Sequence, residues 1–417
     1  MNLISVDDAT ARITAGLHRL PAEAIPLLEA LGRVLAGPVS ADRDLPAQPT
    51  SSMDGFAVRA VDAAVIPATV RLAMDIPAGA LPAHALQAGD AARIMTGAIV
   101  PPGADAVVPV EHTDQQWEGG SGAALGTPVQ IRQPVHAGDA IRQVGSDLAT
   151  GQRLLDAGTV LRAPEIGLLA ALGRASVSVI RQPVVAILST GDELAQPGTP
   201  LLPGQIYDAN SFALASVVQS WGARPIRIPA ARDTLESVRT AFRIALDAAP
   251  DLILSSAGVS VGAHDVVRTV MEELGTLDFW RVNVRPGKPL AFGQIGGIPL
   301  IGLPGNPVSA MVTADLFVRP ALAALSGLRL RAEEIDAVCA EPLTSDGRRS
   351  YLRVTLRHEN GRWLATTTGT QSSSALLSLV LADGLLIIPE GVTEIAPGVT
   401  CRIRLLRPLP AAVDRET

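Results

Sequence analysis

The sequence predicts a multi-domain α/β protein: a domain with a mostly parallel sheet, a β-rich domain, a helical or extended connecting domain and a small C-terminal β-barrel domain. Three observations predict this fold class. The chain has 417 residues, enough for about three domains. Its 38 glycines and 32 prolines indicate many turns and short elements. Strand-like and helix-like patterns alternate between residues 183 and 331, which is typical of parallel sheets with right-handed crossovers.

The pattern of the chain changes twice before residue 183. Apolar residues recur at helical spacing from residue 1 to about 40, so we predict helix there. Short β-like pieces punctuated by Gly and Pro follow at 41–149 and predict the β-rich domain. Residues 150–182 carry Pro near their start and Gly near their end, which predicts a helical return.

The alternating region and the C-terminal region give the sharpest element predictions. In the alternating region we predict strands at 183–190, 224–231, 251–256 and 279–284, and helices at 211–222, 233–249 (capped by Asp233 or Thr234), 263–275 and 307–325. From about residue 332 the pattern is β again, and 348–369 reads as two strands around a turn that contains Asn360-Gly361.

Composition excludes several classes of function. The net charge of −7 disfavours binding to nucleic acid or to an anionic membrane, and 3% aromatic residues give few stacking platforms for single strands. Two cysteines, Cys339 and Cys401, are too few for a disulfide framework. The N-terminus has an Asp pair and no apolar segment of a signal peptide. We therefore expect a cytoplasmic protein with no nucleic-acid and no membrane partner.

Three predicted strands are each followed by a loop of small residues, hydroxyls and acids: 189–193, 255–262 and 302–307. Small residues let the backbone approach a ligand, and the N–H groups of a following helix offer an anion site. Because the carboxyl ends of parallel strands share one edge, we expect the loops to form one ligand site. The alternative is that each loop is only a tight turn.

A basic segment lies between the second and third loops. In an extended chain, positions 281, 283 and 285 share one face, so Arg281 and Arg285 project together, with Lys288 beyond a Pro-Gly turn. Cations beside Gly-rich turns in an acidic protein favour a phosphate or oxyanion clamp. A solvated basic edge strand is the alternative.

Acidic residues at strand ends suggest a metal. Glu193, Asp233 and Asp265 each fall at or just beyond a predicted strand end, where converging carboxylates could hold Mg²⁺. Each acid at a helix start could equally be a cap. In the β-rich region, Asp54-Gly55 is a hairpin-turn signal, and taken alone it marks Asp54 as a turn residue.

A serine hydrolase is a rival interpretation. Residues 258–262 fit the G-x-S-x-G elbow, which would make Ser260 a nucleophile. His358 would be the base and Asp278 or Asp315 the acid. The five-residue pattern is weak, and His358 is predicted to lie in a separate β domain.

The motifs as a group resemble the MoeA family of molybdopterin molybdenumtransferases, which is also represented by the E domain of gephyrin. The resemblance covers essentially the whole chain. It rests on these motifs, in this order: Met53-Asp54-Gly55, RIMTGA at 93–98, Gly191-Asp192-Glu193-Leu194, GVSVG at 258–262 with Asp265, PGKP at 286–289, and GLPGNPVSA at 302–310.

The resemblance implies an elongated homodimer of four-domain subunits. The active site is then expected between the α/β domain of one subunit and the β-rich domain of its partner. The implied domains are 1–22 plus 183–331, a three-layer, MogA-like α/β domain for substrate and phosphate binding; 23–40 plus 150–182, a connecting and dimerising domain; 41–149, the β-rich domain; and 332–417, the C-terminal barrel-like domain.

The resemblance, together with the three loops, also implies the site residues. The expected catalytic positions are Asp54, Thr96, Asp147, Glu193, Asp233 and Asp265, and the expected metal ligands are Glu193, Asp233 and Asp265. The expected substrate-binding positions are Thr190, Gly191, Asp192, Ser256, Gly258, Ser260, Gly262, Arg281, Arg285, Lys288, Pro304, Asn306, Pro307 and Arg353.

The implied reaction is insertion of molybdate into adenylylated molybdopterin, with Mg²⁺-dependent hydrolysis and release of AMP. Such a substrate brings its own dithiolene sulfurs, so the protein needs no cysteine ligands for the metal. Further implied partners are other molybdenum cofactor biosynthesis proteins and recipient molybdoenzymes. A CinA-type nucleotide pyrophosphatase and a non-catalytic scaffold remain as alternatives.

The chain departs from the family pattern in a few places, and none of them removes a matched acid. Ala257 stands where Gly is usual, Ser146 stands where an acid is common, and residues 370–374 lack a glycine often found there. Arg281 and Arg285 replace lysines, which keeps the charge but changes a point donor into a planar fork.

Overall fold

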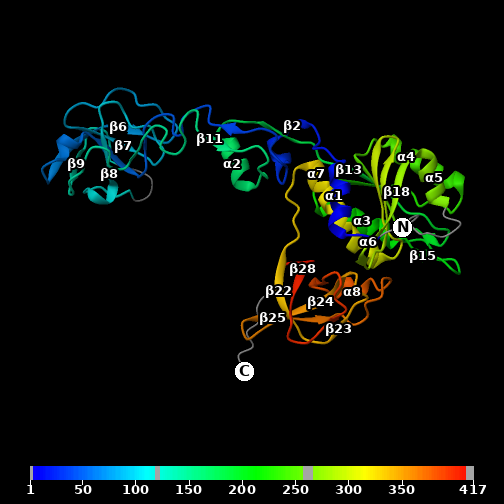
Figure 1. Ribbon diagram of the computed structural model, residues 1–417. Coiled ribbons are helices and arrows are strands. Elements are labelled where there is room, and N and C mark those ends of the chain that lie inside the picture. Colours follow the sequence, from blue (N-terminus) through cyan, green and yellow to red (C-terminus); the bar gives the residue numbers. More distant parts are fainter. Residues whose placement is uncertain (1–2, 118–122, 257–265, 410–417) are drawn as a thin grey trace. The chain divides into compact units, whose positions relative to one another are not determined.

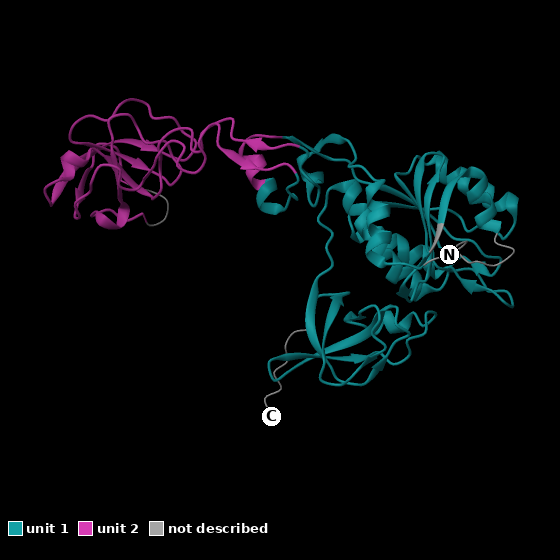
Figure 2. Ribbon diagram, viewed as in Figure 1, with its two compact units in different colours: residues 1–36, 158–166, 175–417 teal, residues 37–157, 167–174 magenta. Residues whose placement is uncertain are grey.

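The structure is a computed structural model that describes residues 3–117, 123–256 and 266–409 (Figure 1). The chain divides into two compact units (Figure 2). Unit 1 comprises residues 1–36, 158–166 and 175–417, and unit 2 comprises 37–157 and 167–174. In sequence, unit 2 is therefore an insertion within unit 1.

The centre of unit 1 is a seven-stranded sheet in which only β20 runs antiparallel to the other strands. This confirms the predicted mostly parallel sheet. The strands, in spatial order, are β1 (Leu3–Ile4), β18 (Gly275–Val282), β20 (Pro289–Ile295), β21 (Ile298–Gly302), β17 (Leu252–Ser255), β13 (Val184–Leu188) and β16 (Arg224–Arg227).

Helices cover both faces of this sheet and make three layers. Alternate residues of β13 point to opposite faces, so Val185 and Ile187 join one apolar cluster while Ala186 and Leu188 join another. The first cluster is covered by α1 (Val6–Ala15), α3 (Ala209–Ser220), α6 (Pro307–Thr313) and α7 (Arg319–Ser326), and the second by α4 (Leu235–Asp247) and α5 (Val266–Leu274).

Helices α6 and α7 form one continuous helical segment through a π-helical turn, η4 (Ala314–Val318). In the described chain, Pro307–Ser326 is the one helix long and apolar enough to cross a membrane, judged by length and composition alone. Its apolar window is 72% buried inside the protein. The apolar composition is therefore that of a core helix.

The C-terminal region is a closed barrel, as predicted. Its strands are β24 (Arg349–Glu359), β25 (Arg362–Thr367), β22 (Glu334–Cys339), β28 (Thr400–Leu405) and β26 (Gly384–Ile388), and β26 pairs back to β24. Asn360 and Gly361 turn between β24 and β25 with positive φ angles of 49° and 75°. This confirms the predicted turn, whose backbone needs residues that tolerate positive φ.

The barrel and the α/β domain share a core. Tyr351 and Leu385, both from barrel strands, belong to the same buried cluster as α1, α3 and α7. Strand β19 (Val284–Arg285) leaves the α/β domain and pairs in parallel with β24. The two parts of unit 1 are therefore joined by packing and by sheet hydrogen bonds.

Unit 2 is β-rich, as predicted. Its main sheet has five strands, β8 (Ala106–Pro109), β5 (Gly55–Val58), β7 (Asp90–Ile94), β6 (Ala68–Ile76) and β9 (Pro128–Ile131), of which only β6 and β7 are parallel. Unit 2 also contains two separate strand pairs: β4 (Thr50–Ser51) with β10 (Ile141–Arg142), and β3 (Val39–Ser40) with β11 (Arg153–Leu155).

Helix predictions near the N-terminus and the return segment are partly wrong. In the described chain, α1 is the only helix before the 3₁₀ turn at Leu27–Ala30, and β2 (Ala22–Pro26) pairs with β12 (Ser176–Ile180). The helical return is only α2 (Ala163–Ala171), between two strands. A partner 150 residues away outweighs the local helical spacing. For α4, the cap is Thr234 and not Asp233.

Candidate functional site

The three predicted loops lie at one edge of the sheet. The Ser256 N–H donates to the Leu188 carbonyl at 2.9 Å, and the Leu303 N–H donates to the Ser255 carbonyl at 2.7 Å. The Asn210 side-chain amide adds a bond to the Gly305 carbonyl at 2.7 Å. The expectation of a shared edge is therefore confirmed for the described parts of the loops.

A buried chain of hydroxyls ties two of these loops to helix α3. Asp208, 2% exposed, accepts hydrogen bonds from Ser211 and, at 3.3 Å, from the Ser189 hydroxyl. Ser189 and Ser256 oxygens lie 2.9 Å apart. Because Ser189 donates its one hydroxyl hydrogen to Asp208, Ser256 must donate to Ser189. The Ser256 oxygen then offers only lone pairs to any further partner.

Glu193 and Asp233, two of the predicted acids of unit 1, lie on the first loop and on the segment after β16, and a hydrogen bond joins these two parts of the chain. The Asp192 carboxylate accepts the Asp233 N–H at 3.2 Å, and Thr190 forms an isolated bridge with Ala231. Gly191 has a φ of 153°, and a Cβ there would lie 2.5 Å from the exposed Glu193 carboxylate. The two loops are therefore held together with their acids at the surface.

Four predicted site residues of the second loop, Gly258, Ser260, Gly262 and Asp265, lie outside the described residues. Ala257, which departs from the family pattern, lies outside them too. Among the described residues, no group of three His, Cys, Asp or Glu side chains could hold a metal ion. Because Asp265 lies outside the described residues, the trio of Glu193, Asp233 and Asp265 stays a prediction.

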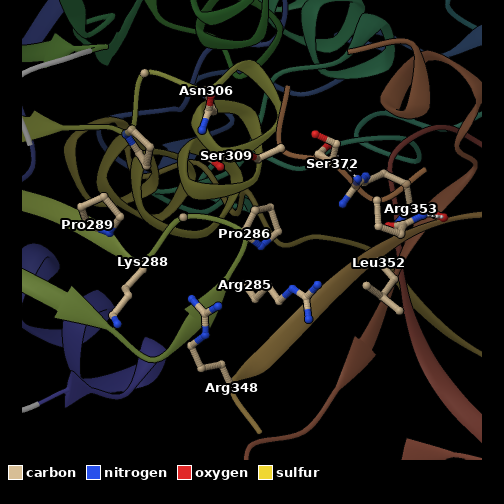
Figure 3. Close-up of a pocket in the computed structure, with 15 residues that line it drawn as sticks. Arg285, Pro286, Lys288, Pro289, Asn306, Ser309, Arg348, Leu352, Arg353 and Ser372 are labelled. Atoms are coloured by element: carbon tan, nitrogen blue, oxygen red, sulfur yellow. Dashed lines mark hydrogen bonds between the residues drawn. The ribbon is translucent and has the colours of Figure 1, made fainter. Parts of the chain in front are cut away.

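A cavity of 690 Å³ opens between the α/β domain and the barrel of unit 1 (Figure 3). Four cations face it, and no carboxylate is among the described residues that line it. The lining residues are Arg285, Pro286, Gly287, Lys288, Pro289, Pro304, Gly305, Asn306, Ser309, Arg348, Leu352, Arg353, Gln371, Ser372 and Ser373.

Arg353 is the buried cation of this cavity. It is 1% exposed, and it donates to the Ser378 hydroxyl at 3.1 Å and to the Ser372 carbonyl at 3.1 Å. No ion pair joins it to a carboxylate of the described chain. Burial, with the nearby Arg285 guanidinium second, lowers the pKa of Arg353 to about 10. A desolvated cation that faces a second cation is an arrangement that an anion stabilises.

The basic turn of the α/β domain forms the facing wall. Gly287 has a φ of 110°, and a Cβ there would lie 2.3 Å from the Thr313 methyl, so only glycine lets the turn pack on α6. Arg285 and Lys288 flank this turn. Asn306 caps α6, and Pro307 begins the helix.

The structure separates two cations that the sequence placed on one face. Strand β18 ends at Val282, and Arg281 stays in the seven-stranded sheet beside Leu3. Arg285 belongs to β19 and pairs with the barrel. Arg281 does not line the cavity, so the predicted common projection of Arg281 and Arg285 is wrong there.

No motif in the sequence indicated Arg348, which lines the cavity from the barrel. Its guanidinium pairs with Asp346 at 2.5 Å and holds the pKa of that carboxyl below its usual range. Arg348 is the first residue of the predicted strand region at 348–369, and no local pattern relates it to Arg285, which lies 63 positions earlier in the chain. Only the pairing of β19 with β24 brings them together.

In unit 2, Asp54 and Thr96 are in direct contact. The Asp54 carboxylate accepts the Thr96 N–H at 2.6 Å and the Thr96 hydroxyl at 2.7 Å. These two bonds, the backbone one first, lower the pKa of Asp54. Asp147 is also exposed, and its N–H donates to the Leu45 carbonyl at 3.0 Å. Asp54 is thus an ionised, oriented carboxylate rather than a bare turn residue.

Two of the residues named for a serine hydrolase, Asp315 and His358, have other neighbours, and Ser260 lies outside the described residues. Asp315 pairs with Arg319 and Arg404, both at 2.6 Å, and the His358 ring packs edge-on against Trp363 at 5.1 Å.

Three family models match consecutive parts of the chain. The MoeA N-terminal region (domain I and II) matches residues 4–173, the probable molybdopterin binding domain matches 186–324, and the MoeA C-terminal region (domain IV) matches 336–406. Together the matches include the β-rich region as well as the α/β domain and the barrel.

Relatives that match nearly the whole chain belong to the same family as the three models. The chain is 40% identical to Molybdopterin molybdenumtransferase 2 of Mycobacterium tuberculosis, over 91% of this chain and 94% of the relative. It is 38% identical to the Molybdopterin molybdenumtransferase of a Nostoc species, over 90% and 87%. The solved molybdopterin biosynthesis MoeA protein of Pyrococcus horikosii superposes with a TM-score of 0.81 at 31% identity, over 97% of this chain and all of the other. Because the three models match most of the chain and the relatives match it over nearly its whole length, the chain belongs to the MoeA family.

Proposed function

We propose that the protein is a molybdopterin molybdenumtransferase that inserts molybdate into adenylylated molybdopterin and releases AMP. The observation that carries the proposal is the cavity around Arg353: a buried cation with no acidic partner in the described chain, opposite Arg285 and Lys288. Molybdate is a tetrahedral dianion, and guanidinium groups bind such oxygens with charge-assisted bonds.

The cavity residues have separate tasks in this proposal. Arg353 and Arg285 neutralise the oxyanion from two sides, and Lys288 adds a point charge at the mouth. The hydroxyls of Ser309 and Ser372 can donate to oxyanion oxygens that the guanidiniums leave unbound. Holding the oxyanion there presents it to the dithiolene of the substrate and supplies proximity rather than acid–base chemistry.

The loop edge serves the nucleotide half of the substrate. In this proposal the phosphates lie along the loops that carry Thr190, Gly191, Ser256 and Asn306. Glu193 and Asp233 fit Mg²⁺, because they are hard oxygen donors on loops joined by the Asp192 bond, and Asp265 would complete the set. Magnesium commonly uses one or two carboxylates together with substrate phosphates, and it would supply charge neutralisation at the phosphoanhydride.

The remaining parts of the proposal concern assembly. We propose a cytoplasmic homodimer in which Asp54, Thr96 and Asp147 of the partner's β-rich domain orient water or molybdate. Recipient molybdoenzymes and other molybdenum cofactor proteins are the proposed hand-over partners. The ionised state and fixed direction of Asp54 support this role.

The test is AMP release from adenylylated molybdopterin, measured with Mg²⁺, with and without molybdate. We expect molybdate-dependent release by the wild type, loss on chelation of Mg²⁺, and loss in Glu193→Gln. Arg353→Ala should raise the molybdate concentration needed for half-maximal release.

Arg357→Ala is the matched control, because Arg357 is an exposed arginine on the same strand as Arg353. It should behave as wild type. AMP release that does not depend on molybdate, or equal behaviour of the Arg353 and Arg357 variants, would sink the proposed role of the cavity.

A further inference from the structure

One face of strand β24 packs the barrel against the α/β domain. Arg349, Tyr351 and Arg353 alternate along this face, while Val354 and Leu356 point into the barrel core. The Arg349 guanidinium donates two hydrogen bonds to the Asp7 carboxylate of α1, at 2.8 and 2.9 Å. Tyr351 packs in the α/β core, and Arg353 lines the cavity. The position of Arg353 therefore depends on how this strand is seated.

A buried ion cluster joins the same two parts on another side of the contact. Asp315 lies in the π-helical turn between α6 and α7 and is 4% exposed. One carboxylate oxygen lies 2.6 Å from Arg319 Nη2, on its own helix, and the other lies 2.6 Å from Arg404 Nε, on barrel strand β28. Arg319 also stands over the Trp221 ring at 4.9 Å.

The cluster has two cations and one anion, with Glu334 farther off. Burial raises the pKa of Asp315, and the two guanidiniums oppose that rise. Burial likewise lowers the pKa of Arg319, and Asp315 opposes it. Without the Asp315 charge, two desolvated guanidiniums would face each other across the contact, and the like charges would push helix and barrel apart.

The helix that carries Asp315 also carries a wall of the cavity. Ser309 lies on its first turn and lines the cavity, and Asp315 follows roughly two turns later. Arg404 and Arg353 lie on β28 and β24, which are both hydrogen-bonded to β26. A shift of the barrel at Asp315 is therefore passed on to Arg353.

We propose that Asp315 is a positioning residue for the oxyanion cavity. Its carboxylate holds β28 against the helix and so fixes the separation of Arg353 from Arg285 and Lys288. The inference rests on the proposed function, because the cavity is there assigned to molybdate.

The experiment compares Asp315→Asn with Asp315→Glu in the full-length chain. Molybdate dependence of AMP release gives KM and kcat, and equilibrium dialysis gives molybdate binding directly. Asp315→Asn should raise the molybdate KM and Kd about tenfold while kcat at saturating molybdate stays within about twofold, since only binding is affected. Asp315→Glu should restore much of the affinity, because the charge is kept.

Asp7→Asn is the matched control for a contact between the same two parts. The Asp7 side chain is 76% exposed, so its ion pair with Arg349 should contribute little and the molybdate KM should stay near that of the wild type. If Asp315→Asn does not fold, Arg404→Lys tests the same contact, because it keeps the charge and removes the planar fork.

The outcomes separate the two proposals. An unchanged molybdate KM in a folded Asp315→Asn or Arg404→Lys variant, with a raised KM in Arg353→Ala, overturns the positioning role and leaves the cavity assignment intact. Wild-type protein that binds no molybdate overturns both. A fall in kcat alone, with KM unchanged and no rescue by Asp315→Glu, also overturns the inference.

Discussion

The two charged regions of this protein are built in different ways. In unit 2, Asp54 is exposed and receives both of its hydrogen bonds from one residue, Thr96, on a neighbouring strand end. In unit 1, Arg353 is buried and depends on a strand, a basic turn and a helix that are far apart in sequence. Local backbone geometry therefore orients the Asp54 carboxylate, whereas the packing of the α/β domain against the barrel positions the Arg353 guanidinium.

The difference teaches what each region can tolerate. An exposed carboxylate keeps its hydration, so losing one of its bonds changes its direction more than its charge. A buried guanidinium has exchanged water for fixed protein carbonyls and hydroxyls, so its charge acts at full strength on whatever enters the cavity. Substitutions of Asp54 should therefore lower kcat, whereas substitutions of Arg353 should weaken the affinity for molybdate.

Asp54→Asn should give the largest effect, in kcat. The amide keeps the size of the side chain but loses the charge that both Thr96 bonds orient, and misplacing a reacting group costs about 10²-fold. The measurement is single-turnover AMP release at saturating molybdate. A kcat within twofold of wild type would show that the partner's β-rich domain does not supply this carboxylate to the reaction.

Arg353→Ala should come next, in affinity. Loss of a charge-assisted contact of about 1.5–3 kcal/mol corresponds to about 10- to 100-fold weaker molybdate binding. Arg353→Lys should fall between, because a lysine keeps the charge without the fork. Equilibrium dialysis with sulfate as competitor measures both. An affinity for molybdate that is equal in the wild type and in Arg353→Ala would contradict the proposed difference between Arg353 and Asp54.

Thr96→Val should give the smallest effect, in the pH dependence of Asp54. Removing the hydroxyl donor leaves the backbone N–H, so the lowered pKa of Asp54 should rise part of the way toward its ordinary value. A group with a depressed folded pKa contributes stability above its unfolded pKa and loses it as pH falls through the folded pKa. The variant should therefore lose that contribution at a higher pH than wild type. NMR titration of the Asp54 carboxyl checks this, and an unshifted midpoint would contradict it.

Much of the fold could be predicted because local and global preferences agree. The Asn360-Gly361 turn and the alternating strands of the α/β domain carry their own signals. Strand β2 does not: residues 22–26 fit a helical period, and only pairing with β12 makes them extended. Long-range pairing of this kind leaves no trace in a window of local sequence.

The same limit applies to the site. Arg353 and Lys288 were identified through family motifs, and the small residues of the loops identified the sheet edge. The common face assumed for Arg281 and Arg285 failed, because the chain leaves one sheet at Val282 and joins another at Val284. Such a change of sheet within two residues follows from packing and not from alternation.

Tyr351 and Leu385 make the C-terminal barrel part of the α/β core, and this bears on where the chain can be cut. A chain ended at residue 331 keeps every strand of the seven-stranded sheet but uncovers the apolar surface under these two side chains. Exposed apolar surface of that kind favours aggregation. The barrel is thus a continuous segment of the sequence, but the α/β domain depends on it for a complete core. A chimera that takes its barrel from a relative would also need the helix faces that pack against that barrel.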